Sequence, residues 1–96
     1  MINHRDVSPS SPRTFDWEGE TVLVAAESES VFWVSKYVDG AAWKVAKLTR
    51  APDVDAEHPW IVRSTAPGNF EESYSGWRAA LKAAASMEVE TGDVVE

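Results

Sequence analysis

The segment from Val31 to Leu48 constrains the fold more than any other part of the sequence. Residues 31–38 are mostly β-branched or aromatic, and the Asp39-Gly40 dipeptide that follows is typical of tight hairpin turns. Residues 42–48 continue the apolar pattern and can form the returning strand. Because an isolated hairpin is only marginally stable, the rest of the chain must supply further strands or a helix. We therefore expect an antiparallel sheet built around this hairpin.

Three further strands are predicted, two before the hairpin and one after it. Residues 14–17 and 21–26 flank Gly19, which can adopt the positive φ of a tight turn, and they predict a first hairpin. Residues 50–59 contain two prolines and three acidic residues, a composition typical of a loop. The apolar run at residues 60–63 then predicts a fifth strand. The sequence thus favours a meander of hairpins with four to five strands.

One amphipathic helix is predicted near the C-terminus. Asn69 can cap its start, with Glu72 reaching back from the third position. Gly76 lies inside this predicted helix, where it is unfavourable, and we interpret it as a place where the helix backbone approaches the sheet closely. Large or small apolar residues recur at helical spacing as far as about Met87, namely Phe70, Tyr74, Trp77, Leu81 and Ala84. The expected fold class is α+β, a small antiparallel sheet with this helix packed on one face.

The chain is expected to form a single domain with two flanking segments. Its 96 residues suffice for one hydrophobic core. Residues 1–12 are rich in serine and proline and are predicted to be a flexible arm; residues 13–88 are the predicted domain; residues 89–96 are a predicted acidic tail. The absence of cysteine excludes disulfides and thiolate metal sites, and the lack of a long apolar stretch leads us to expect a cytoplasmic protein that does not enter membranes.

The charge of the chain is acidic but unevenly distributed. The net charge of −7 repels phosphate backbones and anionic membranes, so nucleic acid is an unfavoured partner. Four of the nine basic residues nevertheless fall within one short segment, at Lys36, Lys44, Lys47 and Arg50. We therefore expect a patchy surface.

No catalytic or metal-binding motif is recognisable. His4 and His58 are the two histidines, and neither is accompanied by a nucleophile or by metal-ligand spacing. A pairing of His58 with Asp55 or Glu57 is explained more simply by an exposed acidic loop. The Asp53-x-Asp55-x-Glu57 pattern resembles the opening of a calcium loop but lacks the glycine and the final glutamate that such a loop needs. We expect a protein that is not an enzyme and uses no cofactor or metal.

The two faces of the central hairpin both contain apolar side chains. Phe32, Val34 and Val38 share one side with Lys36, while Val31, Trp33 and Tyr37 share the other with Ser35. The register of the returning strand depends on whether the Asp39-Gly40 turn has two or three residues, and the sequence leaves this open. One helix covers only one face. The second face is either closed by the first hairpin or is an interface with a protein partner or a second subunit.

The interface interpretation gives the candidate functional residues. They are aromatic and lysine side chains of the central hairpin: Trp33, Tyr37, Trp43, Lys36, Lys44 and Lys47. We predict a small acidic protein–protein interaction module, or a homodimer, of the kind by which phages and mobile elements regulate or inhibit a host protein. Two alternatives use nucleic-acid chemistry. The same aromatic and lysine residues can bind a single strand, or the acidic clusters can mimic a phosphate backbone.

Overall fold

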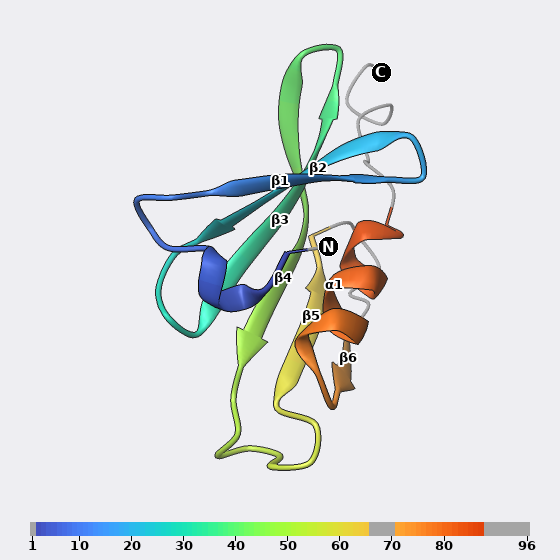
Figure 1. Ribbon diagram of the computed structural model, residues 1–96. Coiled ribbons are helices and arrows are strands. Elements are labelled where there is room, and N and C mark those ends of the chain that lie inside the picture. Colours follow the sequence, from blue (N-terminus) through green and yellow to red (C-terminus); the bar gives the residue numbers. More distant parts are fainter. Residues whose placement is uncertain (1, 66–70, 88–96) are drawn as a thin grey trace.

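The computed structural model describes residues 2–65 and 71–87 and shows one antiparallel sheet with a helix packed against it (Figure 1). Six strands lie side by side in chain order, β1-β2-β3-β4-β5-β6. The elements are a short 3₁₀ helix His4–Asp6 (η1), the strands β1 Arg13–Trp17, β2 Glu20–Ala26, β3 Val31–Val38, β4 Ala41–Arg50, β5 Trp60–Ser64 and β6 Glu71–Tyr74, and the helix α1 Trp77–Ala85. The predicted α+β class and the C-terminal helix on an antiparallel sheet are confirmed.

Both predicted hairpin turns have two residues. In the first turn Glu18 and Gly19 have φ of 50° and 84°, and in the second Asp39 and Gly40 have φ of 52° and 82°. Positive φ at both central positions is the requirement of a type I′ turn, whose twist matches that of the strands it joins. The second turn accordingly pairs Val38 with Ala41. This settles the turn length that the sequence left open.

The predicted number of strands, four to five, is wrong, because residues 2–65 and 71–87 already form six. The additional strand β6 occupies residues that the sequence analysis placed in the first turns of the helix. Its pairing with β5, in which Tyr74 lies opposite Trp60, uses the hydrogen-bonding edge of β5, and tertiary pairing of this kind overrides a local helix preference. The predicted cap Asn69 and the predicted helix residue Phe70 lie outside the described residues.

The interpretation of Gly76 is also wrong. Its backbone is extended (φ −141°, ψ 159°) and it is the N-cap of α1, so the helix starts after it instead of running through it. A Cβ atom placed on Gly76 would meet no other heavy atom within 4 Å. The glycine therefore marks the strand-to-helix junction and not a close approach of the backbone to the sheet.

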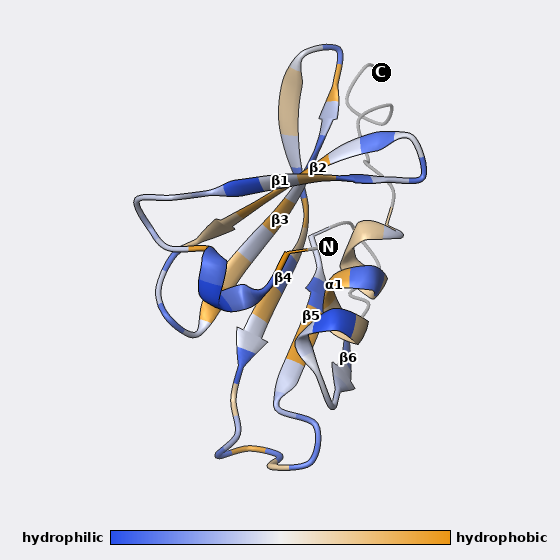
Figure 2. Cartoon of the chain, viewed as in Figure 1, coloured by the Kyte–Doolittle hydropathy of each residue, from blue (hydrophilic) through white to orange (hydrophobic). Residues whose placement is uncertain are grey.

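The hydrophobic core lies between α1 and one face of the sheet, which we call the inner face. Figure 2 shows hydrophobic stretches along the central strands and alternating hydrophobic and polar turns on α1. The helix buries Trp77, Ala80, Leu81, Ala84 and Ala85, and the sheet contributes fully buried residues such as Phe32, Leu48 and Val62. Alanines on the buried side of α1 let the helix lie close to the strands, and Leu81 fills the space between them.

The N-terminal segment packs on the same core. The indole Nε1–H of Trp77 donates a hydrogen bond to the carbonyl of Ile2 (2.9 Å), and Val7 is buried. The ring of His4 lies 5.1 Å from that of Trp60 and 5.6 Å from that of Trp77. Burial and the nearby charges of Arg5 and Arg50 lower the pKa of His4. These contacts were not apparent from the polar composition; the flexibility of residues 1–12 stays a prediction, and the predicted tail 89–96 lies outside the described residues.

Candidate interface on the outer sheet face

A β-bulge in β4 sorts the side chains of the central hairpin. Near the turn Ser35 pairs with Lys44, but further along Val34 pairs with Ala46, so Val45 is an extra residue in β4. An extra residue reverses the alternation of side chains beyond it. Lys47, which an unbroken strand would place on the side opposite Lys44, therefore lies on the same face as Lys44.

Trp33 lies beside these two lysines on the outer face of the sheet, the face opposite α1. The ammonium of Lys44 is 4.4 Å from the centroid of the Trp33 ring, and that of Lys47 is 5.4 Å away. Both are within the range of cation–π attraction, which contributes about 0.5–1 kcal/mol at exposed sites. The indole N–H of Trp33 donates to the carboxylate of Glu27 (3.3 Å). The Trp33 ring thus contacts three charged side chains.

The outer-face residues of this hairpin form a continuous row, which we call the β3–β4 stripe. Proceeding from the turn along paired positions, the row passes from Tyr37 to Ser35 with Lys44, and then to Trp33 with Lys47. Tyr37 is 41% exposed, whereas Trp33 is partly buried. Four of the six predicted interface residues, Trp33, Tyr37, Lys44 and Lys47, are therefore brought together on one face.

The other two predicted residues lie on the opposite side of the hairpin. Lys36 pairs with Trp43 across the strands, and both project from the inner face. Lys36 is almost fully buried, at 3% exposure, and its ammonium is 3.0 Å from the carboxylate of Glu20. Trp43 lies near the turn between β3 and β4 and is 41% exposed. Lys36 is an internal ion-pair partner in this fold and is not part of the stripe.

The first hairpin does not close over the outer face. Strand β2 pairs alongside β3 and extends the sheet, and its inward residues Val22 and Val24 belong to the same core as α1. In Figure 1 both η1 and α1 lie on the near side of the sheet. The sequence did not decide whether the first hairpin covers the second sheet face. In the structure neither this hairpin nor the described helices cover the outer face.

Strand β5 contributes outer-face residues that sequence reasoning missed. Ile61 pairs with Thr49 and Arg63 with Lys47, so both continue the outer face beyond the stripe. With Glu71 of β6 they surround a shallow depression of about 210 Å³. The guanidinium of Arg63 is 2.7 Å from the Glu71 carboxylate. Residues 60–63 are an apolar run that ends in Arg63, so the outward position of Ile61 followed only from the two-residue period of the strand, with Trp60 and Val62 buried on the inner face.

The acidic loop between β4 and β5 uses its carboxylates locally. The Asp55 side chain accepts hydrogen bonds from the backbone N–H groups of Glu57 (3.0 Å) and His58 (3.1 Å). The His58 imidazole lies 3.5 Å from the same carboxyl group, and both side chains are about half exposed. Such a turn is explained by its own hydrogen bonds. Within residues 2–65 and 71–87 there is no group of three or more side chains suited to hold a metal ion.

Comparison of the chain with protein-family models, curated proteins and solved structures finds no match. No helix in the described part of the chain has the length and hydropathy needed to cross a bilayer.

Proposed function

We propose that the protein is a non-enzymatic binding module that docks a protein partner on the β3–β4 stripe. The observation that carries the proposal is the position of Trp33, which lies with Lys44 and Lys47 on the sheet face that α1 leaves open. An aromatic side chain surrounded by charged residues is the composition of the centre and rim of many protein interfaces. A module of this type acts by occupying the surface of its partner, so regulation or inhibition is the role that we expect.

Charge selects the chemistry of the partner. Lys44 and Lys47 make the stripe locally positive on a chain whose net charge is −7. A complementary partner surface carries carboxylates around an apolar centre that contacts Trp33 and Tyr37. A single-stranded nucleic acid is disfavoured on two grounds. The net charge repels it, and the lysine ammonium groups already occupy the ring of Trp33 on which a base would stack.

The proposal can be tested by site-specific photocrosslinking. A photoreactive p-benzoylphenylalanine is placed at Tyr37 in the stripe, and in a control protein at Val54, which is 77% exposed in the loop between β4 and β5. We expect a discrete crosslinked protein at position 37 and none at position 54. The captured protein is then purified, and its affinity for the full chain is measured directly.

Matched charge reversals determine whether capture depends on the stripe. The Lys44→Glu/Lys47→Glu double variant should weaken binding by about tenfold or more, and added salt should weaken the wild-type complex as well. The Arg78→Glu/Lys82→Glu variant alters the charge equally on α1 and should bind normally. Equal loss in both variants would contradict the proposal. Tight binding of an oligonucleotide, or a dimeric mass of the isolated protein by light scattering, would replace the proposed partner with nucleic acid or a second copy.

A further inference from the structure

A second concave surface lies on the inner side of the molecule, between β1 and α1. It has a volume of about 540 Å³ and is lined by Phe15, Asp16, Trp17, Arg78 and Lys82. This volume falls within the range of about 300–1,000 Å³ that is usual for small-molecule sites. The cleft exists because α1 packs mainly on β4, β5 and β6, which leaves space between the helix and the far edge of the sheet.

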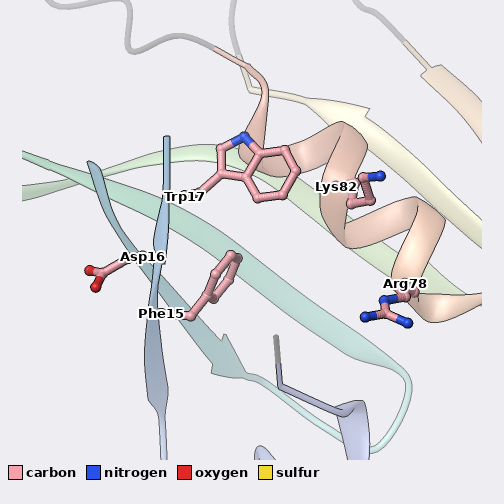
Figure 3. Close-up of a pocket in the computed structure, with 5 residues that line it drawn as sticks. All are labelled: Phe15, Asp16, Trp17, Arg78 and Lys82. Carbon is pink, nitrogen blue, oxygen red and sulfur yellow. The ribbon is translucent and has the colours of Figure 1, made fainter. Parts of the chain in front are cut away.

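The two walls of the cleft have different chemistry. Figure 3 shows the rings of Phe15 and Trp17 extending from β1 toward the helix, with Arg78 and Lys82 on the helical wall. Phe15 and Trp17 share a side because they are two residues apart in a strand, and Arg78 and Lys82 share a side because they are four apart in a helix. One wall is therefore aromatic and the other cationic.

The positive charge of the cleft is not neutralised within the described residues. The Asp16 carboxylate is directed away from the cleft in Figure 3, so Asp16 contributes to the lining without facing the cations. In residues 2–65 and 71–87 the carboxylates that form ion pairs do so with Lys36, His58 and Arg63, and not with Arg78 or Lys82. Two cations four residues apart without a counter-charge repel each other, and an anion between them removes that repulsion.

The aromatic wall also has an unused hydrogen-bond donor. The indole Nε1 of Trp17 is buried and has no hydrogen-bond partner among the described residues. A buried donor without a partner gives up the hydrogen bond that it makes with water in the unfolded chain. Because this N–H is buried beside the aromatic wall, its NMR resonance reports on a ligand that contacts the Trp17 ring.

We infer that this cleft binds a small planar aromatic anion, of which an aromatic carboxylate is the simplest example. The flat apolar body lies against Phe15 and Trp17, and the carboxylate is placed between Arg78 and Lys82, where the guanidinium can form a charge-assisted pair. The ligand class follows from the two walls together. A neutral aromatic compound leaves the cations unpaired, and an aliphatic anion leaves the rings uncovered.

The test uses 2-naphthoate as the probe and the full chain labelled with ¹⁵N. Each of the five tryptophans gives one indole N–H resonance, and the Trp17→Phe variant identifies that of Trp17. We expect the Trp17 resonance to move in a saturable way, with a dissociation constant of about 1 mM, as is ordinary for a ligand of this size. The neutral analogue 2-naphthalenemethanol and acetate should each bind at least about tenfold more weakly.

Neutralising substitutions locate the anion. Arg78→Gln and Lys82→Gln should each raise the dissociation constant about threefold, and the double variant about tenfold. Lys47→Gln removes one positive charge on the outer face and should leave the constant unchanged. The inference is overturned by equal binding of the neutral analogue, by an equal effect of Lys47→Gln, by a shift at another indole only, or by no saturation up to about 10 mM.

Discussion

The ion pair between Lys36 and Glu20 gives a prediction that separates a structural role from a binding role for Lys36. The ammonium is buried, and its carboxylate partner is 3.0 Å away with 49% of its side chain exposed. Two unit charges at this distance attract by about 5 kcal/mol at an effective dielectric constant of about 20, and by about 1.4 kcal/mol in water. Because Glu20 is half exposed, solvent screens the attraction, and the free-energy cost of burying Lys36 offsets part of it.

Removing only the carboxylate should destabilise the fold, because the ammonium remains buried without its partner. We expect Glu20→Gln to lower the free energy of unfolding by about 1–2 kcal/mol. In a domain of this size, Tm falls by roughly 4–8 °C for each kcal/mol lost. Lys36→Met keeps the length of the side chain and removes the charge, so its unfolding free energy should stay within about 1 kcal/mol of the wild type or exceed it.

Urea unfolding of the two single variants and the double variant forms a thermodynamic cycle. In the Lys36→Met background, Glu20→Gln should have almost no effect on the free energy of unfolding. An equal cost of Glu20→Gln in both backgrounds would refute the reasoning, because the carboxylate would then stabilise the fold by some other contact. Lys36→Met should also leave the affinity for a captured partner unchanged.

Three further predictions concern stability. The lowered pKa of His4 means that the folded state binds its proton less readily than the unfolded state, so the unfolding free energy should fall as the pH decreases from about 7 through 6.5 to the folded-state pKa. This part of the pH dependence of the unfolding free energy should be absent in the His4→Gln variant, measured over the same pH range. Gly76→Ser should raise the unfolding free energy by about 0.3 kcal/mol in denaturant titrations, because the α1 N-cap has no side-chain hydrogen bond and there is open space around Gly76. Gly40→Ala should lower it by about 1 kcal/mol, because φ at Gly40 is 82°; a neutral result would mean that the turn can change its conformation.

The strands were largely predictable because local patterns specify them. Alternating and β-branched runs, together with the Glu18-Gly19 and Asp39-Gly40 turns, indicated five of the six strands close to their observed bounds. Strand β6 was not predictable in this way, because its acidic residues also suit the first turn of a helix. Its conformation depends on pairing with β5, which is a tertiary interaction.

The candidate interface was predictable in composition but not in arrangement. Trp33, Tyr37, Lys44 and Lys47 were identified by residue type, yet their common face depends on the bulge at Val45. An extra residue in one strand leaves no mark in the apolar pattern, because Val45 and its neighbour Ala46 are both small and both buried. Lys36 was assigned to the interface because the sequence pattern does not show its burial beside Glu20. That burial depends on the pairing of β3 with β2.

The meander order of the sheet affects how the chain folds while it is being synthesised. Each strand pairs with the strand made just before it, so the hairpins can form one after another as they emerge. The part of the hydrophobic inner face that α1 covers stays exposed until Trp77 and Leu81 have been synthesised. A nascent or truncated chain that stops before Trp77 would therefore expose hydrophobic residues of the inner sheet face. We expect such chains to aggregate or to bind chaperones.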